Sequence, residues 1–439
     1  MLKFFLITDT HYYNCEALGH SSHVDQITLN ESGAIIDAAF DQMIAQADTE
    51  IVLIAGDLSS NGERANHDGF IKKLRRLREN GKRVYVVTAT HDFGLVNLDD
   101  ADAERRPGAT YRSELRGLYD DFGFRDAIAE YEQLSYVAQL APGYRLLGLN
   151  DDLDGYSAGQ LAWILEQIRQ ARADGQFIFA MTHHPALPPS PIYPLISRRD
   201  MLGDYENVTT VLADAGLRFI FTGHSHMQDI RCKRTESGNT LYHINTGALV
   251  GYDTPIRKVT VDGQAMRIET QRVERIDWDT QGKTVSEYTQ DCFDRLLKDI
   301  FHSAAYDIGH LADIAPGFSV PKETVFQYRV PIKIVGKILD RLTLGGLGRL
   351  CLCPRRVAKG VKRVKVNELM LELVRNVYAG DEPYSADTPI GRALLAIVGN
   401  IGVLLRPLLK KTGFGDLRDF IASLIYDSTP DNEAVLPLA

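Results

Sequence analysis

Apolar residues follow two different patterns along this chain. Up to about residue 280, apolar runs of about six residues alternate with longer segments in which apolar residues recur at helical spacing. Short runs rich in Val, Ile, Phe or Leu are typical of strands buried on both faces. The pattern predicts strands at 3–8, 51–55, 84–89, 144–150, 177–182, 218–222 and 241–246.

The segments between these runs have the spacing of amphipathic helices. We expect helices at 33–47, 64–80, 157–173 and 207–215, and Gly81 follows the second of them as a C-terminal stop. A chain in which strands and helices alternate is typical of an α/β layered domain.

After residue 280 only helical spacing is found, for example at 288–305, 367–378 and 390–409. The sequence therefore predicts an α/β domain at 1–280 and an all-α domain at 281–439. The apolar run at 393–405 is interrupted by Gly399, Asn400 and Gly402. Because a membrane span needs about 20 apolar residues, we expect a buried helix here and no membrane span.

Charge and cysteine content narrow the class of protein. The formal net charge of −9 argues against a protein that coats nucleic acid, so we expect no nucleic-acid polymer as a partner. A small phosphorylated substrate is compatible with this charge, because bound metal ions can invert the charge of an acidic site.

The five cysteines are scattered, and residues 1–9 lack the features of a signal peptide. We therefore predict a cytoplasmic protein, and its oligomeric state is left open.

One segment of the second domain is strongly basic. Residues 331–366 contain ten Lys or Arg residues and one acidic residue, Asp340. Three interpretations are open. The segment could be a solvated helix face, a positive wall that steers an anionic substrate, or a helix that lies on a membrane surface.

Aspartate and histidine residues stand directly after five of the predicted strands. Because the carboxyl ends of strands in an α/β sheet meet at one edge, we expect these side chains to converge. A mixture of carboxylate and imidazole suits divalent metal ions of the hard or borderline class. The sequence therefore predicts a metal centre built from Asp9, His11, Asp57, His183, His224 and His226, and we expect His91 and Asp92 at the same edge.

In their order and spacing, these motifs resemble the calcineurin-like metallophosphoesterase family. They are Asp-x-His at 9–11, Gly-Asp at 56–57, His-Asp at 91–92, His183, and Gly-His-x-His at 223–226. They are most similar to the bacterial cyclic-nucleotide phosphodiesterase branch. The resemblance implies a four-layer α-β-β-α sandwich and a hydrolase that cleaves a phosphodiester or phosphomonoester with a metal-bound hydroxide. A diesterase is preferred, because the helical domain could cap the site and read the group beyond the phosphate.

The resemblance also implies a role for each residue. Two metal ions, among Mn, Fe and Zn, would form a binuclear centre. His91 would contact phosphate or protonate the leaving oxygen, and Asp92 would orient His91. The ligands of the first ion would be Asp9, His11, Asp57 and His226, and those of the second Asp57, His183, His224 and the residue at position 90.

Position 90 departs from the family pattern. Where the family has Gly-Asn-His-Asp, this chain has Ala89-Thr90-His91-Asp92, and Thr90 offers a hydroxyl in place of an amide oxygen. The second metal site could be weakened but filled, empty until substrate completes it, or lost together with catalysis. We favour the first explanation, because the other ligands are retained. The third explanation corresponds to a metal-binding scaffold or interaction protein. A DNA nuclease is disfavoured by the acidic balance of the chain.

Overall fold

The structure is a computed structural model, and its contacts divide the chain into two units. One unit consists of Met1–Pro189, Arg199–Phe293 and Asp431–Ala439, and the other of Ser190–Arg198 and Asp294–Pro430. The predicted boundary at residue 280 differs from this division. The first unit extends to Phe293 and also includes Asp431–Ala439 at the C-terminal end of the sequence. The described residues are 1–21, 26–94, 108–132, 134–151, 155–191, 193–196, 200–318, 320–409, 417–427 and 430–438.

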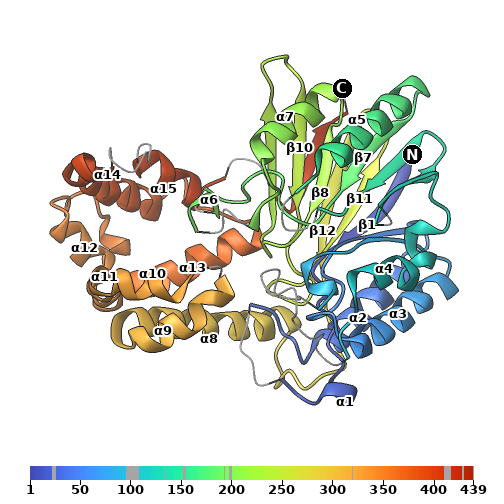
Figure 1. Ribbon diagram of the computed structural model, residues 1–439. Coiled ribbons are helices and arrows are strands. Elements are labelled where there is room, and N and C mark those ends of the chain that lie inside the picture. The colour runs from blue at the N-terminus through green and yellow to red at the C-terminus, as the bar shows by residue number, and fades with distance from the viewer. Residues whose placement is uncertain are drawn as a thin grey trace. The chain divides into compact units, whose positions relative to one another are not determined.

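The first unit contains two sheets (Figure 1), and all seven predicted strands are present in them. The strand order of one sheet is β13 (Glu433–Pro437), β12 (Ala265–Arg272), β11 (Pro255–Val261), β1 (Leu2–Ile7), β2 (Ile51–Ala55) and β3 (Arg83–Val87). The order of the other is β4 (Ala129–Tyr131), β5 (Ser135–Ala141), β6 (Tyr144–Gly148), β7 (Phe177–Met181), β8 (Phe219–Thr222), β10 (Thr240–Asn245) and β9 (Asp229–Arg234).

The strands that were predicted from apolar runs form the parallel centre of each sheet. In the first sheet β1 pairs with β2 and β2 with β3, all parallel. In the second sheet β6, β7, β8 and β10 are parallel neighbours. Parallel strands of this kind are covered on both faces, which is why their sequences are mostly apolar.

Helices form the outer layers of this unit. Buried residues of α2 (Ser32–Ile44) and α3 (Arg64–Glu79) belong to the same core cluster as β1 and β2. Buried residues of α5 (Ala158–Ala173) and α7 (Tyr205–Ala215) share a second cluster with β6, β7 and β8. The predicted α-β-β-α sandwich is confirmed. The remaining helical segments of this unit are α1 (Cys15–Leu18), α4 (Arg112–Leu118), the turn Thr90–Asp92 and the segment Asp120–Phe124.

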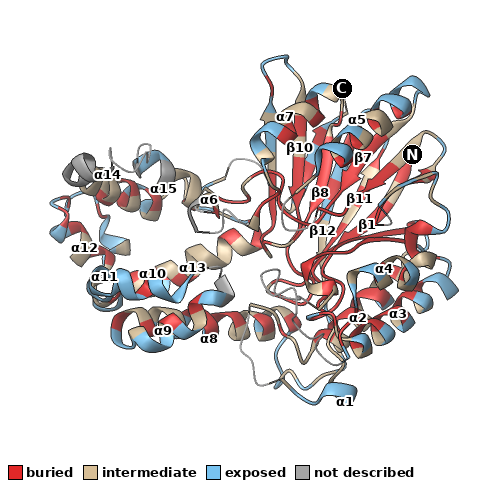
Figure 2. Cartoon of the chain, viewed as in Figure 1, coloured by how far each residue is buried: buried red, intermediate tan, exposed pale blue. Residues whose placement is uncertain are grey.

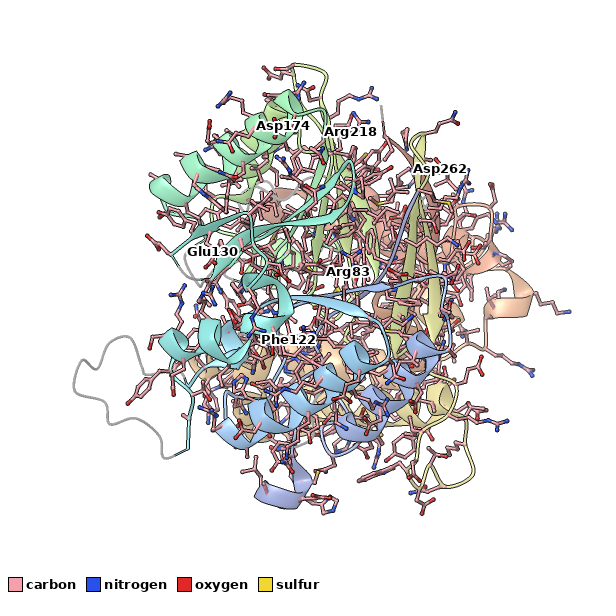
Figure 3. The ribbon with its side chains drawn as sticks, turned by 90° about the vertical axis from the view of Figure 1, so that its right-hand side faces the viewer. Arg83, Phe122, Glu130, Asp174, Arg218 and Asp262 are labelled. Carbon is pink, nitrogen blue, oxygen red and sulfur yellow. The ribbon has the colours of Figure 1, made fainter. Side chains whose placement is uncertain are left out.

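Aromatic side chains fill the space between the two sheets, and the residues of the central strands are mostly buried (Figure 2). The ring of Phe4 on β1 lies 5.6 Å from those of Phe179 on β7 and Phe221 on β8. Phe122, labelled in Figure 3, is buried in the same cluster, and the Arg78 guanidinium lies 5.9 Å from its ring centroid. This core holds the carboxyl ends of strands from both sheets in fixed positions.

The second unit is helical, as predicted. Its core cluster includes Leu344, Leu369, Ala393 and Ile397. Among the described residues, no helix combines the length and the apolar character that crossing a membrane requires. The helices of this region are α6 (Tyr193–Ile196), α8 (Val285–Tyr306, which begins in the first unit), α9 (Ile308–Ile314), α10 (Lys322–Gln327), α11 (Arg329–Arg341), α12 (Leu344–Leu350), α13 (Val366–Ala379), α14 (Pro389–Leu409) and α15 (Leu417–Ile425).

Candidate metal centre

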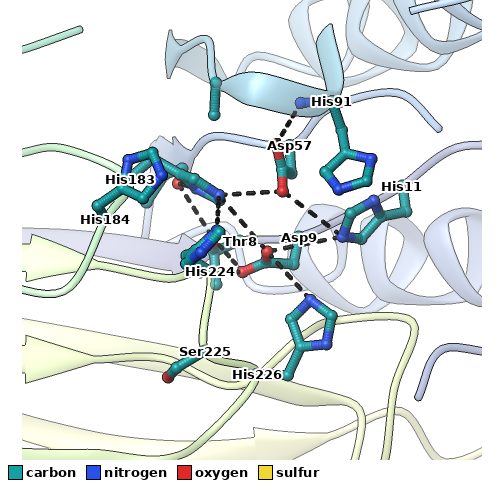
Figure 4. A network of polar contacts seen from close by, with 12 residues as sticks. Thr8, Asp9, His11, Asp57, His91, His183, His184, His224, Ser225 and His226 are labelled. Atoms are coloured by element: carbon teal, nitrogen blue, oxygen red, sulfur yellow. Dashed lines mark hydrogen bonds and ion pairs between the residues drawn. The ribbon is translucent and has the colours of Figure 1, made fainter. Parts of the chain in front are cut away.

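Six aspartate and histidine side chains gather at the carboxyl ends of β1, β2, β7 and β8 (Figure 4). They form two triads, and within each triad the potential ligand atoms lie within 4.8 Å of one another. Strands of both sheets therefore contribute to a single cluster. One triad is Asp9, His11 and His226, and the other is Asp57, His183 and His224.

The Asp57 carboxylate connects the two triads. Its Oδ2 atom lies 3.0 Å from His183 Nε2 and 3.7 Å from His11 Nε2. On the other side of the cluster, Asp9 Oδ1 lies 3.4 Å from His226 Nε2 and 3.6 Å from His11 Nε2. A carboxylate with imidazoles on both sides can serve two ions at the spacing of roughly 3.5–4 Å found in two-metal sites.

Backbone hydrogen bonds hold the loops that carry these residues. The N–H groups of Asp9 and His11 donate to the carbonyls of Gly56 and Asp57, at 3.1 and 2.9 Å. The N–H of Gly223 donates to the carbonyl of His183 at 3.0 Å. The loops after β1 and β2 are thus joined to each other, as are the loops after β7 and β8.

Five of the six triad residues have a positive φ. The values are 50° for Asp9, 34° for His11, 48° for Asp57, 66° for His224 and 58° for His226. Residues other than glycine seldom adopt this left-handed conformation. Such backbone strain concentrates at functional sites, where the surrounding structure enforces it.

Two glycines leave room for the ligand side chains. A Cβ atom on Gly56 would lie 2.5 Å from His183 Nδ1, and one on Gly223 would lie 2.4 Å from Asp9 Oδ2. Both distances are far shorter than van der Waals contact, so a larger residue would displace a triad side chain. Steric crowding thus explains why glycine precedes Asp57 and His224.

Hydrogen bonds outside the cluster direct the free lone pairs inward. Asp9 Oδ2 accepts from Thr8 Oγ1 and from the His224 N–H, at 2.8 and 2.9 Å. His183 Nδ1 lies 2.7 Å from the Ala55 carbonyl, so it must donate, and Nε2 faces the cluster. Asp9 Oδ1 and His11 Nε2 are buried and have no hydrogen-bond partner among the described residues. Such orphaned buried atoms call for a partner, and this donor set fits a metal ion.

The electrostatics of the cluster favour a bound cation. Burial would raise the pKa of Asp57, but His183, His91 and His11 outweigh it and lower this pKa well below its usual value. Burial would also lower the pKa of His183, but Asp57 and Asp9 raise it to about 10. Positive charge is thus stabilised between the carboxylates, and a metal ion that enters has to displace a proton.

His91 lies beside the two triads. Its backbone N–H donates to Asp57 Oδ1 at 3.0 Å, which leaves Oδ2 for the cluster. Its ring centroid is 4.9 Å from that of His11, and its Nδ1 lies 3.2 Å from Asn61 Oδ1. Asn61 therefore orients this ring.

Asp92 does not contact the His91 ring in the part of the chain that the structure describes, which corrects the role expected for it. Its carboxylate accepts the backbone N–H groups of Ser59 and Ala89, each at 2.8 Å, and ties the loop after β2 to the loop after β3. Burial and the charge of Asp57 raise its pKa to about 7. Thr90 is buried in the turn just before His91, and its role as a ligand stays a prediction.

Three contacts near the cluster could not be recognised in the sequence. His67 on α3 lies 2.8 Å from the Asp92 carbonyl through Nε2 and 2.7 Å from the Tyr119 hydroxyl through Nδ1. A lone histidine in an amphipathic helix gives no sign of such a role. His184 Nδ1 lies 3.1 Å from Asp151 Oδ1, and the His184 ring packs against that of His224, with 4.4 Å between the ring centroids. Asp151 does follow a predicted strand, which was the one available signal.

Comparison with known proteins identifies one family. The model of the calcineurin-like phosphoesterase family matches residues 2–228, a range that contains all six triad residues. The search of curated proteins found no match.

Solved structures that match part of this chain include two phosphatases and a hydrolase. A dimetal phosphatase from Danio rerio is 14% identical over 63% of this chain and 97% of its own, with a TM-score of 0.44. A purple acid phosphatase from yellow lupin seeds is 13% identical over 62% of this chain and 51% of its own, with a TM-score of 0.45. A phosphopantetheinyl hydrolase from Mycobacterium tuberculosis is 15% identical over 60% of this chain and 96% of its own, with a TM-score of 0.32.

Proposed function

Because this chain belongs to the calcineurin-like phosphoesterase family, we propose that it hydrolyses a phosphodiester of a small molecule at the cluster of two triads. The position of the Asp57 carboxylate carries this proposal, because its Oδ2 atom faces histidines of both triads. A single-ion site would not need a charged group shared in this way. A phosphomonoester substrate is the alternative.

We infer that the triads hold two metal ions, with Mn, Fe or Zn as candidates. Asp9, His11 and His226 would hold one ion, His183 and His224 the other, and Asp57 would contribute to both. When bound, such ions orient a phosphate ester, neutralise its charge and acidify water. The chain itself supplies fixed ligands, since the Thr8 hydroxyl and the Ala55 carbonyl prevent Asp9 and His183 from rotating.

His91 is the proposed group that meets the substrate phosphate or its leaving oxygen. Its ring lies next to His11, and Asn61 fixes the orientation of that ring through Nδ1. A protonated ring could then donate from Nε2 while Nδ1 keeps its bond to Asn61. Further predictions of the sequence are a cytoplasmic location and a helical segment that caps the site and recognises the group beyond the phosphate.

An assay with chromogenic esters tests the proposed activity. We expect the purified chain with Mn²⁺ to hydrolyse bis-p-nitrophenyl phosphate faster than p-nitrophenyl phosphate. Chelation should abolish the activity, and added Mn²⁺ should restore it, because the proposed reaction requires bound metal ions. Faster turnover of p-nitrophenyl phosphate would establish a monoesterase instead. Activity that survives complete chelation would refute a metal-dependent reaction.

Substitution of Thr90 by asparagine tests whether the second metal site is weakened. An amide oxygen is a better ligand than a hydroxyl, so we expect Thr90→Asn to lower the Mn²⁺ concentration for half-maximal activity by roughly tenfold, the effect of about 1.4 kcal/mol. Thr210→Asn on the outer surface of α7 is the matched control and should change nothing. An unchanged activation constant in Thr90→Asn would mean that position 90 does not contribute to the site.

A further inference from the structure

A second candidate site lies within the helical unit, in a cavity of about 650 Å³. Four arginines line it: Arg355 and Arg356 from the loop after α12, Arg392 from α14 and Arg418 from α15. No carboxylate is among its described lining residues. None of the six triad residues of the metal centre takes part in it.

The loop that carries two of these arginines is fixed from beneath. Cys351, Cys353 and Val357 are buried in the core cluster of the unit, so the residues between them face outward. Asn400 Nδ2 on α14 donates to the Cys351 carbonyl at 2.8 Å and ties the loop to that helix. The backbone that carries Arg355 is therefore positioned before any ligand arrives.

Among the described residues, the charges of Arg355, Arg356 and Arg392 are only weakly compensated. Arg355 and Arg356 are exposed and form no ion pair with the described residues. Arg392 Nη1 donates to the backbone carbonyl of Asp387 at 2.7 Å, a neutral partner. Gathering guanidinium groups in one cavity costs free energy through repulsion, and an anion that binds among them removes this cost.

The cavity also has an apolar side. Leu395 and Ala396 of α14 contribute to its lining, and Leu352 at the loop is 82% exposed. A volume of about 650 Å³ falls in the roughly 300–1,000 Å³ range of small-molecule sites. The dimensions therefore suit an organic anion better than an inorganic ion alone.

We propose that this cavity binds a phosphate-bearing ligand with an apolar portion. The arginine forks would bind the phosphate oxygens in pairs, a geometry for which guanidinium groups are especially suited. The apolar portion would contact Leu395 and Leu352. A free phosphorylated metabolite and the headgroup of an anionic lipid share this chemistry.

Titration of the full chain with pyrophosphate, monitored by calorimetry with excess chelator, tests the site without metal ions. We expect binding that weakens at least about tenfold in Arg355→Gln/Arg356→Gln, since charge-assisted phosphate contacts are lost. Arg341→Gln/Arg349→Gln removes the same charge at exposed positions outside the lining and should change affinity less than about twofold.

A second variant blocks the cavity without changing its charge. A Cβ atom added at Gly399 on α14 would meet only Arg418 Cδ, at 4.0 Å, so Gly399→Leu can extend into open space. This variant should also weaken pyrophosphate binding, with an unchanged melting temperature as evidence of folding. Unaltered binding in both cavity variants, equal weakening in the control pair, or no binding of any probe would overturn the proposal.

Vesicles distinguish the two sources of the ligand. Co-sedimentation with phosphatidylglycerol vesicles, absent with phosphatidylcholine and lost in both cavity variants, would assign a lipid headgroup. Pyrophosphate binding without co-sedimentation would assign a soluble metabolite. Either result supports a phosphate site in the helical unit.

Discussion

Replacing Asp57 with asparagine is expected to lower kcat for bis-p-nitrophenyl phosphate by about 10²–10⁴-fold, since both proposed metal ions lose a charged ligand and such ions stabilise the transition state by several kcal/mol. The substitution keeps the shape of the side chain and removes its charge. Asp57 is 1% exposed, and its Oδ2 atom lies close to His11 and His183.

Metal analysis separates this effect from general damage. Elemental analysis of the variant should show a metal content that falls from about two ions per chain to one or fewer, because both proposed sites lose a ligand. Asp41→Asn is the matched control, since Asp41 is exposed and its Oδ1 atom accepts only from Arg76 among its described contacts. Full activity in Asp57→Asn would contradict the proposed centre.

The sequence was sufficient to locate the triads because two regularities coincide in this fold. Apolar runs mark the parallel strands, and the residues that follow such strands lie at one edge of a sheet. Spacings such as Asp9-x-His11 and His224-x-His226 then direct two side chains to the same side. The positions of the triad residues follow from where the strands end, so they could be predicted without knowing the order of the strands in each sheet.

Contacts that depend on three-dimensional packing were beyond prediction. The role expected for Asp92 followed from its place next to His91, but its carboxylate is 0% exposed and accepts two backbone N–H groups. Asn61, which does contact the ring, is thirty positions earlier in the chain. The left-handed conformation of the triad residues likewise follows from loops held together across strands.

Some strands also escaped prediction, because their apolar pattern is weak. In β13 only Ala434 and Leu436 are buried. This strand pairs with β12, which lies far earlier in the sequence. In β9 the buried residues are confined to its first part, where Ile230 packs on the core. Two apolar positions cannot be distinguished from those of a loop, whereas a run of six can.

Replacing His91 with glutamine is expected to lower kcat by about 10²–10⁴-fold, the usual contribution of a general acid or base, and to leave the metal content unchanged. The second part follows from the geometry, because the contact of His91 with Asp57 is made by its backbone N–H. Glutamine preserves that donor. His302→Gln, at an exposed position of the helical unit, is the matched control.

The leaving group shows whether His91 donates a proton. A p-nitrophenolate ion leaves without protonation, whereas the alkoxide released from a cyclic nucleotide needs a proton, so the loss in His91→Gln should be greater for the cyclic nucleotide. Burial lowers the pKa of His91, and the charge of Asp57 only partly opposes this shift. The ring can donate a proton only below that pKa. The wild-type kcat for the alkoxide substrate should therefore decline as the pH rises through that pKa, and the variant should lack this limb. Equal losses of kcat with both leaving groups, together with an unchanged pH profile, would mean that His91 only binds the phosphate. A residue that only binds the substrate has the same effect whatever the basicity of the leaving group.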